Sequence, residues 1–109
     1  MKFLIFISLL FSCPWAIAKT TCYAHRGGGW NYFDNSLGAF KGALKEKFEG
    51  VEMDLHQTKD GQIILLHDDN LSEVAVGVEC PLNENIGHLF FSNVKEKCKL
   101  KNGDNVTTI

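Results

Sequence analysis

The chain has 109 residues, of which 45% are hydrophobic and 22% charged, and its formal net charge is -2. This composition is typical of a globular protein and excludes a disordered or fibrous one. The ten lysines are scattered along the sequence and Arg26 is the only arginine. We therefore expect no basic stripe that follows a phosphate backbone, and no nucleic-acid partner.

Residues 1–18 have the features of a secretory signal peptide. Lys2 gives a positive start, residues 3–11 form an apolar run, and Ala16-Ile17-Ala18 is an A-x-A cleavage signal. The apolar run is too short to span a bilayer as a permanent helix. We expect a secreted or periplasmic protein that consists of residues 19–109 after cleavage and has no transmembrane segment.

Export would allow the remaining cysteines to form a disulfide. Signal removal takes away Cys13 and leaves Cys22, Cys80 and Cys98, and exported thiols tend to pair. Cys80 and Cys98 are the expected pair because both follow the central hairpin and would bracket one helix. Cys22 then lacks its partner or stays free and buried. The alternative leader is a lipoprotein signal with acylation at Cys13.

The clearest secondary-structure signal is a helix before Gly50. Asn35 or Ser36 is expected to cap its start, and Gly50 to end it. Its large apolar residues recur at helical spacing with lysines mostly on the other side, and they are Leu37, Phe40, Leu44 and Phe48. The pattern predicts that this stripe packs in the core.

Strands are expected on both sides of this helix. Residues 20–25 form the first candidate strand, and the second begins near Val51. Strand, helix and strand make a βαβ unit with parallel strands. Active sites of α/β barrels gather where parallel strands end. The topology therefore predicts a site that brings two pairs of residues together, His25 with Arg26 and Glu52 with Asp54.

A hairpin follows the second strand. Asp60-Gly61 is a strong signal for a two-residue turn, in which Lys59 faces Gln62 and Asp54 faces His67. Glu52 and Asp54 share one face of an extended strand. The hairpin therefore predicts that two carboxylates and a histidine converge.

Signals elsewhere are weaker and leave alternatives open. The glycines at 27–29 permit close approach to a ligand or form a plain flexible loop. The next aromatic residues line a pocket or only pack, and they are Trp30, Tyr32 and Phe33. Residues 71–78 read as a loop or a short strand, residues 85–97 as a helix, and residues 106–109 as the start of a strand.

Glu52 and Asp54 are candidate metal ligands. Inward carboxylates are costly unless they are paired or bind a cation, and hard oxygen ligands suit Mg²⁺ or Ca²⁺ better than zinc. The alternative is an exposed acidic stripe on an ordinary strand. A histidine-rich zinc site is less favoured because no cysteine lies near in the sequence.

The other candidate residues suggest acid/base chemistry on a phosphate. His25 and His67 together offer one general base and one general acid. Arg26 offers a planar fork for phosphate oxygens. His56 falls on the same strand face as a candidate supporting residue, whereas His88 is expected in solvent.

Several short motifs occur in the order and spacing of one enzyme family. Within residues 22–71 the sequence resembles the glycerophosphodiester phosphodiesterases in His25-Arg26-Gly27, Asp34-Asn35-Ser36, Glu52-x-Asp54, Thr58-Lys59-Asp60-Gly61 and His67-Asp68. The resemblance implies an α/β fold, a (β/α)₈ TIM barrel. It also implies hydrolysis of small-molecule glycerophosphodiesters to glycerol 3-phosphate and an alcohol, with a divalent cation, Mg²⁺ or Ca²⁺.

The same resemblance implies roles for individual residues. His25 and His67 would be the acid/base pair, Arg26 the phosphate clamp, and Glu52 and Asp54 two metal ligands. Asp34, Asn35 and Asp68 belong to motifs that would support the site, with Asn35 holding its loop.

The length suggests only the N-terminal part of such a barrel. A (β/α)₈ barrel takes about 250 residues, so residues 19–109 would stop after about the second βα unit. The third metal ligand of the family would lie beyond Ile109. We therefore expect residues 19–109 alone to fold poorly and to show no diesterase activity.

The sequence also differs from the family pattern at two places. Residues 33–35 read Phe-Asp-Asn where Pro-Glu-Asn is usual, and residues 73–75 read Glu-Val-Ala where Arg-Thr-Thr is common. The rival enzyme is a barrel phosphodiesterase that cleaves phosphatidylinositol or sphingomyelin. The rival from another class is a catalytically inactive secreted binding protein on the same barrel, against which the full set of candidate residues argues.

Overall fold

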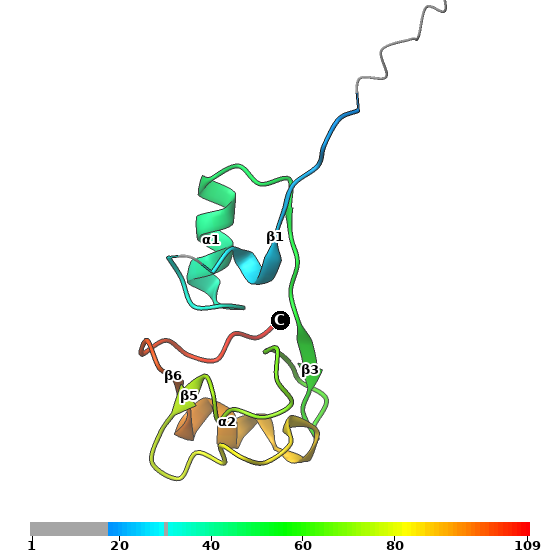
Figure 1. The fold of residues 1–109 in the computed structure, drawn as a ribbon. Coiled ribbons are helices and arrows are strands. Elements are labelled where there is room, and N and C mark those ends of the chain that lie inside the picture. The colour runs from blue at the N-terminus through cyan, green and yellow to red at the C-terminus, as the bar shows by residue number, and fades with distance from the viewer. Residues whose placement is uncertain (1–17, 30) are drawn as a thin grey trace, which may run out of the picture.

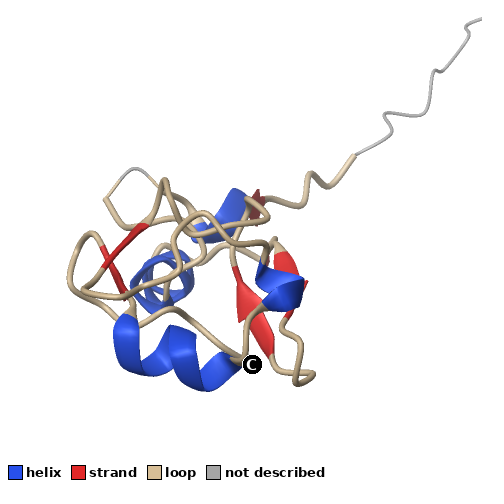
Figure 2. Ribbon diagram, turned by 90° about the horizontal axis from the view of Figure 1, so that it is seen from below, coloured by secondary structure: helices blue, strands red, loops and turns tan. Residues whose placement is uncertain are grey.

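The computed structural model describes residues 18–29 and 31–109. Its short strands form three two-stranded sheets, and loops and turns make up most of the remaining chain (Figure 2). Figure 1 shows two parts, with α1 and β1 in one and α2, β5 and β6 in the other. Most of the expected signal peptide, the acylation site at Cys13 and Trp30 lie outside the described residues.

The first part is the predicted βαβ unit. Strand β1 (Tyr23–Ala24) pairs in parallel with β2 (Gly50–Val51), and helix α1 (Leu37–Lys45) connects them. This confirms the parallel pairing. Strand β1 is shorter than predicted because a 3-10 turn, η1 (His25–Gly27), follows it directly. The second strand is also shorter than predicted and ends at Val51.

Helix α1 begins where predicted and ends earlier than predicted. The Ser36 side chain accepts a hydrogen bond from the Ala39 N–H at 3.1 Å, which caps the first turn. At the other end, Phe48 N donates to Ala43 O at 3.1 Å, and Lys47 N donates to Leu44 O at 3.1 Å. With Lys47 at φ 61, these bonds form a Schellman motif. Gly50 therefore belongs to β2 instead of ending the helix.

The prediction that the large apolar stripe of α1 forms core is wrong. Leu37 is 57% exposed and Leu44 78% exposed, whereas the buried face consists of Ala39, Gly42 and Ala43. The Tyr32 ring packs so closely on this face that a Cβ on Gly42 would lie 2.3 Å from Tyr32 Cε2. Because the residues on this face are small, the loop before α1 packs directly against the helix. The side of α1 that packs is therefore opposite to the stripe.

The hairpin forms with a register shifted by one residue. Strand β3 (Leu55–Gln57) pairs antiparallel with β4 (Ile63–Leu65), and Leu55 lies opposite Leu65. The predicted pairings of Lys59 with Gln62 and of Asp54 with His67 are therefore wrong.

The reason is a three-residue loop in place of the expected two-residue turn. Thr58 N donates to Gln62 O at 2.8 Å, which leaves residues 59–61 as the loop. Gly61 has φ 84, as expected when a type I turn is followed by a left-handed residue. The Thr58 hydroxyl accepts from Gln62 N at 3.0 Å and donates to Asp60 at 2.7 Å, so local polar contacts select this loop.

The second part holds the main core. Strand β5 (Ala75–Val76) pairs antiparallel with β6 (Lys99–Leu100), and the 3-10 turn η2 (Ile86–His88) precedes helix α2 (Phe91–Lys97). The helix predicted for residues 85–97 is thus two pieces, because Leu89 and Phe90 are extended. Its buried cluster comprises Ile64, Leu66, Leu71, Ala75, Ile86, Leu89, Val94, Cys98, Leu100 and Val106.

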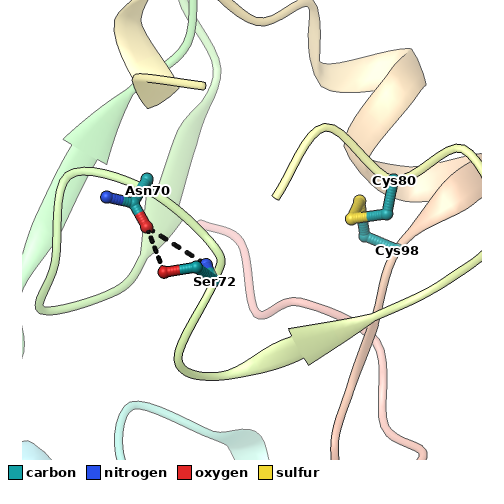
Figure 3. The surroundings of a disulfide bond; sticks show 4 residues. All are labelled: Asn70, Ser72, Cys80 and Cys98. Carbon is teal, nitrogen blue, oxygen red and sulfur yellow. Dashed lines mark hydrogen bonds between the residues drawn. A yellow bond between two sulfur atoms is a disulfide. The ribbon is translucent and has the colours of Figure 1, made fainter. Parts of the chain in front are cut away.

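The predicted disulfide is confirmed. Cys80 and Cys98 are bonded (Figure 3), and their link brackets η2 and α2. In the loop before it, Asn70 Oδ1 accepts from Ser72 N at 3.1 Å and from Ser72 Oγ at 2.8 Å. Cys22 is free, as one alternative stated, but it is exposed instead of buried.

The last residues return to the hairpin. Thr108 forms an antiparallel bridge with Ile64, and Leu65 N donates to Thr107 O at 2.9 Å. The strand-like character predicted for residues 106–109 is confirmed, and this segment runs in the direction of β3. Within residues 18–29 and 31–109, no helix is long and apolar enough to cross a membrane.

Candidate active site

A tight turn presents the first candidate residues at the end of β1. Gly28 N donates to His25 O at 2.8 Å, and Arg26 adopts φ 51 and ψ 27. Left-handed backbone is uncommon for a residue other than glycine and often marks functional sites. A Cβ on Gly27 would lie 2.7 Å from Ala39 Cβ, so glycine lets this turn rest directly on α1.

Arg26 is the centre of the charged cluster. Its Nε lies 3.2 Å from Asp54 Oδ2, its NH1 lies 3.4 Å from Asp34 Oδ2, and its backbone N–H donates to Glu52 Oε2 at 3.1 Å. The Nε atom is buried without a hydrogen bond of good geometry among the described residues. Two carboxylates at the guanidinium and a third at the backbone of Arg26 leave an excess of negative charge at this place.

Asn35 connects this cluster to the start of α1. Its Nδ2 donates to Asp54 Oδ2 at 2.9 Å, and its Oδ1 accepts from the Asp54 N–H at 3.1 Å. Asn35 is 3% exposed and has φ 56, so its position is fixed by packing and by a specific backbone conformation. These two bonds hold the Asp54 carboxylate toward Arg26.

His25 lies at the edge of the cluster. Its Nε2 is 3.8 Å from Glu52 Oε2, and its side chain is 74% exposed. Strand β2 ends at Val51 and β3 begins at Leu55, so Glu52 and Asp54 lie in the segment between the two strands and not within the predicted strand. The two acids meet at Arg26, one on its backbone and one on its side chain.

His67 follows the hairpin and lines the same hollow as Arg26. Both residues line a hollow of about 90 Å³ together with Asp34, Asn35, Leu65, Leu66, Asp68, Val74 and Leu100. His67 Nδ1 lies 2.7 Å from Asp68 Oδ1. The register shift does not remove His67 from the site, because β4 ends at Leu65 and the chain leaves the ladder before it.

A second, more open hollow of about 360 Å³ adjoins the first. Tyr32, Phe33 and Gly29 line it, with Asp34 and Val74 shared between the two hollows. Tyr32 and Phe33 therefore do line a surface pocket. Phe33 and Val74 belong to the two segments where the sequence differs from the family pattern.

Glu52 and Asp54 have the donor chemistry for a hard divalent cation. Within the described residues, their hydrogen bonds and ion pairs use Glu52 Oε2 and Asp54 Oδ2, which leaves the second oxygen of each for a cation. Among residues 18–29 and 31–109, no group of three or more potential ligands is close enough to hold a metal. The two carboxylates fit Mg²⁺ or Ca²⁺ as part of a ligand set.

Comparison with known proteins identifies the family. The sequence pattern of the glycerophosphoryl diester phosphodiesterase family matches residues 25–105, which is most of this chain. The match includes every candidate site residue named above. The chain therefore belongs to the glycerophosphoryl diester phosphodiesterase family.

Individual relatives agree with this assignment. A glycerophosphodiester phosphodiesterase of Caldanaerobacter subterraneus subsp. tengcongensis is 37% identical over 59 residues, which cover 54% of this chain and 24% of the relative. A lysophospholipase D of Homo sapiens is 34% identical over 90 residues, covering 75% of this chain and 28% of the relative. A crystal structure of a Thermotoga maritima glycerophosphodiester phosphodiesterase has a TM-score of 0.60 and 28% identity, covering 83% of this chain and 41% of that one.

The chain spans about a quarter of the length of the curated relatives it matches. Its structural neighbours are TIM-barrel proteins of the same family, and the α/β unit described here is consistent with part of such a barrel.

Proposed function

We propose that this chain supplies phosphate-binding, acid/base and metal-binding residues of an exported glycerophosphodiester phosphodiesterase. The enzyme would hydrolyse glycerophosphodiesters to glycerol 3-phosphate and an alcohol. The observation that carries the proposal is the hollow that Arg26 and His67 share, with the Glu52 and Asp54 carboxylates bound to Arg26 beside it.

Arg26 would bind the phosphodiester. Its guanidinium is held by Asp34 on NH1 and by Asp54 on Nε, so it needs little reorganisation to meet a phosphate oxygen. Its side chain is 23% exposed, which reduces competition from water. A planar fork with several donors suits phosphate better than the single ammonium of a lysine does.

His67 and His25 would transfer the protons. When Asp68 accepts the Nδ1–H of His67, the Nε2 of that ring is left to give or take a proton. His25 would act on the Glu52 side of Arg26. One histidine takes the proton of the attacking oxygen, from water or the neighbouring glycerol hydroxyl. As the bond from phosphorus to the alcohol oxygen breaks, the other histidine protonates that oxygen.

Glu52 and Asp54 would hold the cation. A bound Mg²⁺ or Ca²⁺ would offset the charge that develops on the phosphate oxygens. Asn35 holds Asp54 through two hydrogen bonds, one to its carboxylate and one from its backbone N–H, so the protein prepares this ligand before metal or substrate arrives.

The experiment measures glycerol 3-phosphate release by the full-length protein, with deacylated glycerophosphodiesters and intact phospholipids offered separately. Chelator should abolish release, and Mg²⁺ or Ca²⁺ should restore it. Glu52→Gln and Asp54→Asn should lower both activity and cation dependence, whereas Glu46→Gln, an exposed acid at the end of α1, serves as the matched control. Cleavage of intact phospholipids alone would contradict the substrate class, and full activity in chelator would contradict the metal.

Export is tested separately by N-terminal sequencing of the mature protein. The disulfide between Cys80 and Cys98 supports an oxidising compartment. Cleavage should leave Lys19 as the first residue. A mature protein that begins with acylated Cys13 would favour the lipoprotein alternative, and one that retains residues 1–18 would contradict export by a cleaved signal.

A further inference from the structure

We propose that His56 is a positioning residue that holds His67 at the site through a hydrogen bond to its backbone. The catalytic effect of this hydrogen bond rests on the proposed function. The hydrogen bond itself can be tested whether or not the protein has that activity.

The regular ladder of the hairpin ends before the chain reaches His67. Leu55 and Leu65 are the last paired residues, and Leu66 N donates to Asp54 O at 3.2 Å one step further. From β3 the His56 ring then reaches the segment that follows β4, where its Nε2 lies 3.2 Å from His67 O. A side chain thus extends the cross-strand bonding by one residue, to the residue that carries the proposed acid or base.

The other contact of His67 does not locate its segment. Asp68 is the adjacent residue, so its 2.7 Å contact with Nδ1 orients the ring and moves together with it. The His67 side chain is 53% exposed, so packing restrains it only in part. The bond from His56 comes from a different strand, and it fixes where His67 lies relative to Asp54 and Arg26.

The chemistry of this bond is specific. A carbonyl oxygen only accepts hydrogen bonds, so the Nε2 of His56 must carry a proton. An apolar side chain of similar size cannot replace it. A glutamine can, because its amide N–H donates from a comparable distance along the side chain.

The first test compares His56→Leu with His56→Gln in the full-length protein. One hydrogen bond of ordinary strength predicts that kcat falls about tenfold in the leucine variant. KM should stay within about twofold, since Arg26 and its carboxylates are unchanged, and glutamine should restore kcat to within about threefold of wild type. His88→Leu removes an exposed histidine of η2 and is the matched control.

The second test does not depend on turnover. Hydrogen exchange at the amide of Leu66, which donates to Asp54 O directly before His67, followed by NMR, should be faster in His56→Leu and close to wild type in His56→Gln. The proposal would be overturned if His56→Leu and His56→Gln had the same exchange rate and the same kcat as each other. It would also be overturned if His56→Leu changed KM and left kcat unchanged. If the wild-type protein releases no glycerol 3-phosphate, the proposed function is wrong, and the exchange data still decide whether His56 holds His67.

Discussion

The two parts of this molecule differ in what holds them together. Among the described residues of the βαβ unit, 23–29 and 31–51, the buried hydrophobic side chains are alanines, at positions 24, 39 and 43. In the hairpin and disulfide region, residues 55–106, a contiguous cluster of isoleucine, leucine and valine side chains is buried and a disulfide encloses part of it. Large apolar residues of the βαβ unit instead remain exposed, and Leu44 is the clearest example at 78%.

This difference shows how the candidate site is held. Fully burying a leucine stabilises a fold by about 1.5–3 kcal/mol, and the βαβ unit gains little of this. Its site residues are held by polar contacts instead, chiefly those of Arg26 with its carboxylates and of Asn35 with Asp54. His67 and Asp68, in contrast, extend from the well-packed part. The site therefore depends on how the two parts are placed relative to each other.

The largest expected effect comes from removing one histidine on each side of this division. His25→Ala and His67→Ala should each lower kcat by about 10²–10⁴, the usual range for a general acid or base. If both act in one step, the double variant should lose little more than either single variant. Steady-state kinetics of all three variants on a glycerophosphodiester measures this.

His88→Ala is the control for the loss of an exposed histidine. Losses that multiply in the double variant would indicate that the two parts contribute independently. A single variant with wild-type kcat would remove that histidine from the mechanism.

The next prediction tests whether the two parts differ in their response to loss of the disulfide. Removal of the Cys80–Cys98 disulfide by a double change to serine should destabilise the well-packed part by about 3 kcal/mol, the chain-entropy value for a loop of this size. Hydrogen exchange should accelerate mainly in α2, β5 and β6, and less in α1. Cys22→Ser is the matched control because Cys22 is exposed and free. Equal acceleration in both parts would show that they unfold as one cooperative unit.

The sequence predicted the local features well where one strong signal decided them. The helix cap at Asn35 or Ser36, which is Ser36, the parallel βαβ connection and the pairing of Cys80 with Cys98 are all confirmed. Each follows from chemistry that operates within a short segment or from a topological rule. The family was also recognisable, because several short motifs occur together at fixed spacing.

The sequence failed where individual side-chain contacts chose between alternatives that its pattern leaves open. The side of α1 that packs was wrong because the Tyr32 ring selects Gly42, and no periodicity reports such a contact. The hairpin register was wrong because the Thr58 hydroxyl stabilises a three-residue loop. The contact of His56 with His67 depends on that register, so the sequence alone could suggest a supporting role but not the atom involved.

A smaller effect is expected at the start of α1. Ser36 is 1% exposed and its Oγ accepts from Ala39 N at 3.1 Å. Ser36→Ala should lower the free energy of unfolding by about 1 kcal/mol through loss of the cap. Because the neighbouring Asn35 holds Asp54, activity should fall as well. Chemical denaturation and kcat/KM measure the two effects, with the exposed Ser92→Ala in α2 as control.

Unchanged stability in Ser36→Ala would show that packing alone sets the start of α1. A loss of stability without any loss of activity would show that Asn35 keeps its place without the cap. Either result would show that the cap of α1 affects the candidate site less than the observed contacts suggest.

The smallest effect concerns Asp60, which ties the hairpin loop to α2 inside the well-packed part. Its Oδ1 accepts from the Thr58 hydroxyl at 2.7 Å and from Phe91 N at 3.0 Å. These two hydrogen bonds, that from Thr58 first, lower the pKa of Asp60 below its ordinary value of 3.8. A carboxyl with a lowered pKa stabilises the folded state while it is ionised, so its contribution is present above pH 3.8 and is lost as the pH falls through the lower folded-state value.

Asp60→Asn should therefore reduce Tm slightly at pH 6, and the difference from wild type should narrow as the solution is acidified below pH 3.8. Glu84→Gln, at an exposed acid of the same part, is the control. A difference in Tm that stays constant down to the acid limit would mean that the charge of Asp60 does not matter and that only the shape of its side chain does.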